Sequence, residues 1–237
     1  MNVLIVHAHN EPKSFNTSMM NLAVEVLQGE GHEVLVSDLY EMKFNPVASA
    51  DDFRDRANTD HLVYALEQRH AFAGGTFAPD IAAELEKIKW ADLVIFNFPI
   101  YWYSMPAIMK GWIDRVFVSG YCYGGTRIYD RGGLRGKKAM LAFSLGGQAH
   151  MFGPGAVHGE LEVLLQPIQR GMLGYVGLTV LPPFVAFHVP YISAEARRDC
   201  LEQYRAHLLT LEQRAPLAFP SLDDFDDRLQ PRVAAAS

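Results

Sequence analysis

The chain has few of the features that mark secreted or membrane-spanning proteins. Only two of its 237 residues are cysteines, Cys122 and Cys200, which argues against a disulfide framework and favours a reducing compartment. The longest apolar run, residues 93–103, is interrupted by Asn97 and Pro99 and is too short to span a bilayer. No basic segment precedes the first apolar run, so we recognise no signal peptide and expect a soluble, cytoplasmic protein.

Positive charge is also scarce. The 21 Lys and Arg residues are outnumbered by 27 Asp and Glu residues, which gives a formal net charge of −6, and no run of basic residues occurs. This balance argues against a nucleic-acid-binding surface. Hydrophobic residues make up 49% of the chain and charged residues 20%, so a sizeable globular core is expected.

Several motifs of other enzyme classes are missing. The chain contains no GxxxxGK[ST] phosphate loop, no HExxH zinc motif and no GxSxG nucleophile elbow. His7 and His9 resemble a metal-binding pair, but no third ligand has a suitable spacing, so we predict no metal site. These absences disfavour P-loop, zinc-dependent and serine-hydrolase chemistry.

What the sequence does contain is an alternation of short apolar runs with amphipathic segments. The apolar runs predict strands over 3–6, 34–36, 93–96, 139–144 and 178–181. Apolar residues at helical spacing predict helices over 16–29, 80–89, 106–116, 160–172 and 194–211. The long connection of residues 41–79 is expected to hold short helices over 47–56 and 60–72. The alternation predicts an α/β fold with a doubly wound, five-stranded parallel sheet and helices on both faces.

The last part of the chain differs from the rest. We expect one domain over residues 1–214 and a C-terminal tail over 215–237, which is rich in prolines and carries the acidic cluster 223–227. Such a tail can pack as an extended segment on a partner subunit. A partly disordered terminus is the alternative.

Three loops follow predicted strands and carry residues suited to a flavin. In the first, residues 8–16, Ser14 and Asn16 can cap a helix and reach a phosphate, while His9 and Lys13 can add positive charge. An ordinary capped helix explains the same residues. Since ligands of open parallel sheets lie outside the carboxyl ends of the strands, the three loops can hold one cofactor.

The other two loops suit a flat ring. Trp102 and Tyr103, in the second loop, can lie against an isoalloxazine, although core aromatics are the alternative. In the third loop, Gly146 and Gly147 allow the backbone to approach a ligand closely. His158 can stabilise negative charge on a reduced flavin, or it can be a structural histidine. Together these features indicate a redox flavoprotein.

Over residues 1–220 the chain resembles the flavodoxin-like NAD(P)H:quinone oxidoreductases of the DT-diaphorase type. The resemblance is carried by ordered motifs, namely Val3 to His9 with Ser14-Phe15-Asn16, Ser37-Asp38-Leu39-Tyr40, Pro79-Asp80-Ile81, Ala91 to Phe96 with Phe98-Pro99, Pro106-Ala107-Ile108, Lys110-Gly111-Trp112, Tyr129-Asp130, Gly146-Gly147 and His158-Gly159. It implies a homodimer that binds FAD, with FMN less favoured, and uses NADH or NADPH as electron donor. It also implies two-electron ping-pong transfer, in which hydride passes from nicotinamide to flavin N5 and then to a quinone-like acceptor.

The resemblance assigns roles to particular residues. It implies that the pyrophosphate and neighbouring atoms are held by His9, Ser14, Phe15 and Asn16. It implies that the flavin ring is lined by Pro99, Ile100, Tyr101, Trp102 and Tyr103 on one side and by Ser144, Leu145, Gly146 and Gly147 on another. Arg197 is implied to face the FAD adenylate, His158 to be the catalytic histidine, and Tyr123 to be a pocket tyrosine donated across the dimer.

Some positions depart from the family pattern and leave alternatives open. Phe152 stands where the family has the tyrosine partner of the histidine, Gly125 replaces a second pocket tyrosine, and Tyr101 and Val63 replace glutamines. These changes predict an altered acceptor pocket. The alternatives are an azo- or nitro-reductase, a regulatory ancillary subunit of a potassium efflux system that needs a membrane partner, and a flavin-free binding module.

Overall fold

Consecutive apolar residues build the centre of the sheet. The computed structural model describes residues 1–232, in which β1 (Asn2–His7), β3 (Leu93–Pro99) and β4 (Lys138–Ser144) lie side by side and are almost wholly buried. A strand buried on both faces needs apolar side chains at successive positions, which explains the runs in the sequence. With β2 (Glu33–Asp38) and β5 (Thr179–Val180) the order is β2-β1-β3-β4-β5, and all pairings are parallel, as predicted.

The strand beside β4 is split into two short pieces. The sequence predicts one strand over residues 178–181, whereas the structure has β5 (Thr179–Val180) and a further strand, β6 (Phe184–Ala186), both paired with β4. Between them lie Pro182 and Pro183, which have no N–H group to donate to the ladder. The two pieces therefore share the edge position that the sequence assigns to a single fifth strand.

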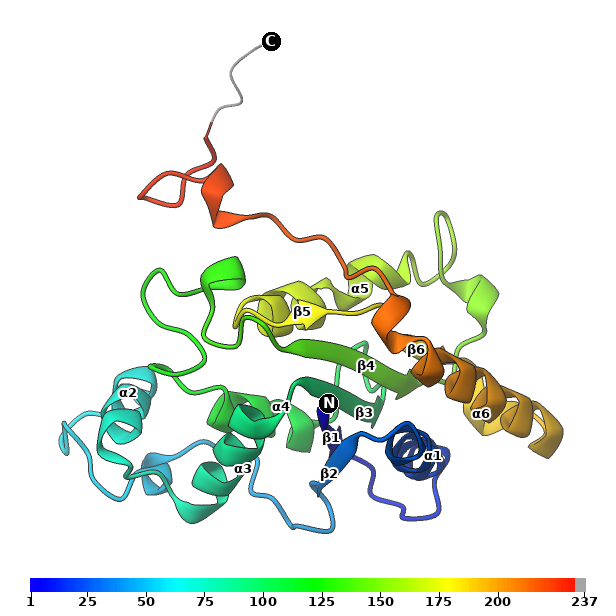
Figure 1. The fold of residues 1–237 in the computed structure, drawn as a ribbon, viewed down its shortest axis with the longest axis horizontal. Helices are drawn as coiled ribbons and strands as arrows, with labels where there is room; N and C mark the ends of the chain where they lie inside the picture. The colour runs from blue at the N-terminus through cyan, green and yellow to red at the C-terminus, as the bar shows by residue number, and fades with distance from the viewer. Residues whose placement is uncertain (233–237) are drawn as a thin grey trace.

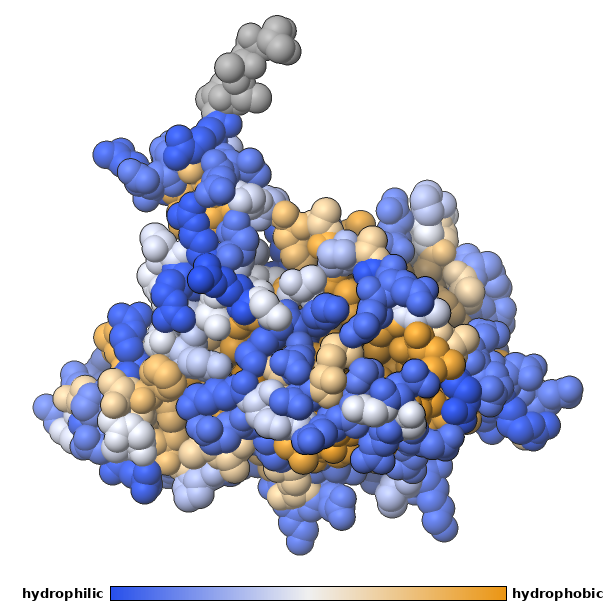
Figure 2. Space-filling view, viewed as in Figure 1, coloured by the Kyte–Doolittle hydropathy of each residue, from blue (hydrophilic) through white to orange (hydrophobic). Residues whose placement is uncertain are grey.

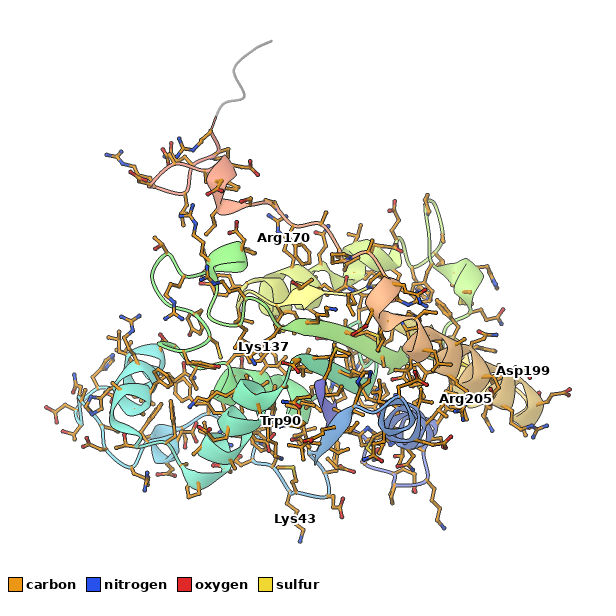
Figure 3. All side chains as sticks on the ribbon, viewed as in Figure 1. Lys43, Trp90, Lys137, Arg170, Asp199 and Arg205 are labelled. Atoms are coloured by element: carbon orange, nitrogen blue, oxygen red, sulfur yellow. The ribbon has the colours of Figure 1, made fainter. Side chains whose placement is uncertain are left out.

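Helices cover both faces of the sheet, as Figure 1 shows. On one face α1 (Phe15–Gly29) and α6 (Ala194–Leu209) pack side chains such as Met19 and Tyr204 against Val3 and Ile95. On the other face α3 (Pro79–Trp90), α4 (Ala107–Val116) and α5 (Leu161–Ile168) pack against the alternate strand residues. Arg205 of α6, labelled in Figure 3, also pairs with Glu25 of α1 at 2.9 Å.

The helix predicted over 160–172 changes its geometry midway. It contains Pro167, and beyond Ile168 the chain continues as a π-helical turn, Gln169–Gly174. A proline inside a helix removes one backbone hydrogen bond and crowds the preceding turn. The predicted segment is therefore helical throughout, but it is not one regular α-helix.

A buried arginine holds the long connection of residues 41–79 against the rest of the domain. It contains a 3₁₀ turn, Ala50–Asp52, and α2 (Tyr64–Gly74), close to the two short helices expected there. Arg115 of α4 donates to Asp52 at 2.8 Å, to Asp80 at 2.6 Å and to the Asn45 carbonyl at 2.8 Å. This network holds the connection against α3 and α4, so the loop is part of the packed structure.

The C-terminal segment 215–232 leaves α6 and projects from the body of the domain (Figure 1). Its Leu217 N–H donates to the Val180 carbonyl at 2.8 Å, and its Ser221 hydroxyl donates to Asp130 at 2.6 Å. Figure 2 shows that this projection is mainly hydrophilic on the face in view, and Arg170, labelled in Figure 3, lines a cavity beneath it. The described part thus contacts its own chain. Packing on a partner stays a prediction, and 233–237 lie outside the described residues.

Candidate functional site

Two cavities meet at the carboxyl edge of the sheet, where the three predicted loops converge. The polar cavity, about 450 Å³, is lined by His9, Lys13, Phe15, Asn16, Ser18, Pro99, Tyr101, Ser144, Val189, Pro190 and Arg197. The apolar cavity, about 210 Å³, is lined by Ile100, Trp102, Tyr103, Leu145, Gly146, Gly147, Phe152, His158, Leu161, Leu164 and Leu165. Neighbouring residues of the same two loops, 99–103 and 144–147, line the two cavities, so the cavities lie beside each other at this edge of the sheet.

The polar cavity is built around the start of α1. Ser14 caps this helix by accepting a hydrogen bond from the Thr17 N–H at 3.1 Å. Asn16 is buried, and its Oδ1 accepts a 2.6 Å bond from the Ser144 hydroxyl, which ties the first loop to the third. The Asn16 Nδ2 group is buried without a partner among the described residues. A buried donor of this kind needs an acceptor, and an oxygen of a bound ligand can supply it.

The charge in the polar cavity comes from Lys13 and Arg197 and not from His9. Burial lowers the pKa of His9, and its Nδ1 accepts the Glu11 N–H at 3.0 Å, so the imidazole is neutral near pH 7. In the chain alone His9 is thus a neutral group that can donate through Nε2, and its positive charge beside a bound phosphate stays a prediction. Arg197 is held at the rim by the carbonyls of Val189 at 3.3 Å and Pro190 at 3.5 Å.

A second histidine, which is fully buried, contacts the first turn of α1 next to this loop. His7, at the end of β1, lies 3.3 Å from Asn97 Oδ1 through Nδ1 and 3.3 Å from the Thr17 hydroxyl through Nε2. Burial lowers its pKa, so it too is neutral near pH 7. Its contacts join β1, β3 and the first turn of α1 directly beneath the polar cavity.

The apolar cavity opens beside a strained turn. Tyr101 and Ser104 exchange backbone hydrogen bonds at 2.9 and 3.0 Å, and between them Trp102 and Tyr103 have φ values of 50° and 58°. Such angles are costly for aromatic residues and cluster at ligand-binding sites. The turn leaves Trp102 96% exposed, and an aromatic surface of this size gains from being covered.

His158 and Tyr103 meet across the mouth of the apolar cavity. The Tyr103 hydroxyl lies 2.8 Å from His158 Nδ1, and the Phe152 ring packs against the imidazole with ring centroids 5.0 Å apart. A Cβ atom at Gly147 would come within 2.9 Å of the Phe152 ring, so a larger residue here would displace that ring. The site thus places one imidazole at the edge of a flat, apolar space.

Of the predicted site residues, all but two line one of the cavities. Ser14 acts as the helix cap beside the polar cavity, and Tyr123 lies outside both, packed against Tyr175 at a centroid distance of 5.7 Å. The predicted donation of Tyr123 across a dimer is not tested within one chain. The sequence interpretation missed Val189 and Pro190 in the polar cavity and Leu161 and Leu164 in the apolar one. The sequence indicates for these two leucines only a place on the apolar face of the helix predicted over 160–172.

The chemistry of the two cavities fits a flavin nucleotide. An aromatic and glycine-lined slot suits a flat ring, and a helix N-terminus with Lys13 and Arg197 beside it suits phosphates. The unpaired Asn16 donor points to the same kind of ligand. Within residues 1–232, no group of three or more His, Cys, Asp or Glu side chains is arranged to hold a metal ion. Among the helices of the described chain, none has the length and apolar character needed to cross a membrane.

Comparisons with known proteins agree with this geometry. The sequence pattern of the flavodoxin-like fold family matches residues 1–208. NAD(P)H dehydrogenase [quinone] 1 of Rattus norvegicus is 41% identical over 228 residues, which cover 96% of this chain and 83% of the rat protein. Ribosyldihydronicotinamide dehydrogenase [quinone] of Mus musculus is 41% identical over 216 residues, which cover 91% and 94%. The crystal structure of a proposed quinone reductase from Klebsiella pneumoniae superposes with a TM-score of 0.93 at 42% identity, covering 98% of this chain and 94% of that one.

Proposed function

Because this chain belongs to the flavodoxin-like family of NAD(P)H:quinone oxidoreductases, we propose that its two adjacent cavities together hold one FAD molecule. The chain is an NAD(P)H dehydrogenase that reduces quinones. The observation that carries the FAD proposal is the meeting of a phosphate-binding and a ring-binding cavity at loops 99–103 and 144–147. The polar cavity supplies cations and N–H donors, and the apolar cavity supplies flat apolar walls.

The extent of the polar cavity favours FAD over FMN. Its lining runs from Asn16, at the start of α1, to Arg197 of α6, and Val189 and Pro190 extend the wall beyond the helix N-terminus. FMN ends at one phosphate, whereas FAD continues through a second phosphate to an adenosine. A guanidinium held at the far rim suits the additional part of the larger cofactor.

The chain's residues orient the reactants and control charge. FAD, when bound, would accept a hydride from the donor and pass it on to the acceptor, which is chemistry that protein side chains do not supply. Lys13 and the first turn of α1 would neutralise phosphate charge, while Gly146 and Gly147 would let the backbone approach the ring. His158 would donate a hydrogen bond to oxygen atoms on which negative charge develops, and Leu161 and Leu164 would exclude water from that space.

Purification without added cofactor tests the proposal directly. The protein is expressed, purified, denatured, and the released ligand is identified by chromatography against FAD and FMN. We expect FAD in a ratio near one per chain. FMN would contradict the choice of cofactor, and a colourless protein that binds neither flavin would reject the flavin site.

Acceptor kinetics then separate the enzyme from its alternatives. We expect NADH or NADPH to support rapid reduction of small benzoquinones, with azo dyes and nitroaromatics reduced more slowly. Dihydronicotinamide riboside is included as donor because one relative is named for it. Slow quinone turnover together with capture of a membrane channel would instead favour the regulatory-subunit alternative.

We also propose that the protein is a homodimer, to which Tyr123 contributes from one chain to the pocket of the other. Tyr123 is only partly buried and lies outside the cavities of its own chain. Its exposed part is available to a second copy.

A further inference from the structure

One hydrogen bond joins two loops that both line the apolar cavity. The Tyr103 hydroxyl is 2.8 Å from Nδ1 of His158, and the two rings meet at an angle of 63°, with centroids 5.8 Å apart. The residues are 55 positions apart in the sequence, and both line the apolar cavity. The contact therefore belongs to the site and not to the core.

Among the described residues, no other side chain hydrogen-bonds this imidazole. Phe152, which packs against it with ring centroids 5.0 Å apart, carries only carbon atoms and cannot hydrogen-bond. Within residues 1–232, the second ring nitrogen, Nε2, has no protein partner. The bond to Tyr103 is thus the one polar contact by which the described chain can set the state of this ring.

The backbone is arranged to make this contact. Tyr103 has a φ of 58° in the strained turn between Tyr101 and Ser104, and a residue other than glycine rarely adopts that conformation. A turn that keeps such a residue at unfavourable angles is fixed by its surroundings, and strain of this kind is typical of functional sites. Here the turn directs a phenol toward His158.

We propose that Tyr103 is the positioning residue for His158, and that its hydroxyl donates to Nδ1 so that the neutral imidazole carries its proton on Nε2. The proposal rests on the function proposed above for the apolar cavity. A neutral imidazole has one donor and one acceptor nitrogen, and occupation of the acceptor by a phenol fixes which nitrogen is the donor. Nε2–H is then presented to a carbonyl or oxyanion oxygen of the bound reactants.

Nitrogen NMR tests the tautomer without turnover. Protein labelled with ¹⁵N-histidine is compared as wild type and as Tyr103→Phe, with the His158 signals identified by their loss in His158→Gln. In the wild type we expect nearly all neutral His158 to carry its proton on Nε2, and in Tyr103→Phe we expect the tautomer ratio to fall about fivefold. Tyr40→Phe, which removes an exposed hydroxyl that lines neither cavity, is the control and should leave the ratio unchanged.

A double-mutant cycle tests the consequence for the reaction. In stopped-flow experiments on the loaded protein, Tyr103→Phe should slow reduction by the nicotinamide donor about fivefold to tenfold. The same change made in His158→Gln should have no further effect, because Tyr103 acts through His158.

Three outcomes decide the matter. An unchanged tautomer ratio in Tyr103→Phe would overturn the proposal, and so would a rate loss that persists in the His158→Gln background. A changed ratio with a loss confined to the His158-containing protein supports it. Should the wild-type protein bind no flavin, the proposed function fails, while the NMR comparison still decides whether Tyr103 sets the tautomer.

Discussion

At the scale of single residues, neighbouring side chains hold the ring of His158 while one of its nitrogen atoms stays available for the reaction. Its ring packs against Phe152 and is hydrogen-bonded to the Tyr103 hydroxyl, while the described residues 1–232 leave Nε2 for a ligand. An imidazole placed in this way can donate a hydrogen bond to a nearby oxygen atom and so stabilise negative charge that develops on it. The loop that carries it contributes little else that can donate a hydrogen bond to the apolar cavity.

Replacement of His158 should therefore affect the reaction and not the fold. We expect His158→Ala to slow flavin reduction in stopped-flow about tenfold to a hundredfold, because one charge-stabilising donor is lost. Thermal unfolding should change little, since the ring is only partly buried. His150→Gln, an exposed histidine of the same loop, is the control. Equal rates for wild type and His158→Ala would remove the role assigned to this residue.

Glycine at position 111 is fixed by a close approach of two segments. A Cβ atom there would lie 2.2 Å from the Pro46 carbonyl oxygen, so α4 and the long connection touch backbone to backbone. We expect Gly111→Ala to lower the free energy of unfolding by about 1–3 kcal/mol, despite the better helix propensity of alanine. Gly29→Ala is the matched control, because no atom lies within 4 Å of its Cβ position. Urea denaturation measures both, and equal stability of the two variants would contradict the clash.

At the scale of helices and strands, the buried charge network of Arg115 connects three segments. Loss of the guanidinium leaves the buried Asp52 carboxylate without its counter-charge, because its other donors, the Tyr64 hydroxyl and the Ser49 N–H, are neutral. We expect Arg115→Met to cost about 3–5 kcal/mol of unfolding free energy. Lys110→Met removes an exposed pair with Asp114 and should cost less than about 1 kcal/mol. Comparable urea midpoints for the two variants would show that the network contributes no more than a surface pair.

The regular elements could be predicted because their pattern is local. The central strands were recognised from runs such as Val3–Val6, and the helix start at Ser14 from its capping residue. The site loops followed from these, since parallel strands place their ends at one edge. The strand Phe184–Ala186 was missed because it is three residues long and follows two prolines.

What could not be predicted depends on distances between remote segments. The bond from Tyr103 to His158 joins positions 55 residues apart, and no local pattern marks it. The neutral state of His9 likewise follows from burial and from the Glu11 N–H, which a sequence does not display. The sequence could not show that Leu161 and Leu164 line a cavity, because apolar residues recur at the same intervals on a helix face whether that face lines a cavity or a core.

At the scale of the whole molecule, one buried histidine makes stability depend on pH. His207 of α6 packs edge-on to Phe184, and burial lowers its pKa to about 4 from an ordinary value near 6.5. Below pH 6.5 this histidine therefore binds a proton in the unfolded chain but not in the folded chain. The contribution of neutral His207 to the free energy of unfolding is full above pH 6.5 and is lost as the pH falls toward 4. Between pH 7 and pH 5 we expect a loss of about 2 kcal/mol from this residue.

Urea titrations at the two pH values, on wild type and His207→Leu, measure this contribution. The variant should lose less stability on acidification than the wild type, and the remaining dependence should reflect His7 and His9, whose pKa values are also lowered by burial. Parallel losses in the two proteins would show that His207 is protonated as readily when folded as when unfolded.

The proposed dimer is also a property of the whole molecule. Light scattering coupled to gel filtration should give a mass near twice the 26.5 kDa of one chain. If Tyr123 serves the partner's pocket, Tyr123→Ala should raise the KM for quinone with little effect on cofactor content. A monomeric protein with full activity would refute the shared pocket.

The broken edge of the sheet has a consequence for the protein in a crowded solution. An outermost strand with free N–H groups is a template on which strands of other molecules can stack into aggregates. Here Pro182 and Pro183 offer no such groups, and the Val180 carbonyl just before them is already occupied by the Leu217 N–H. The two prolines that make this strand hard to recognise in the sequence thus also disfavour the pairing of this sheet edge with strands of other molecules.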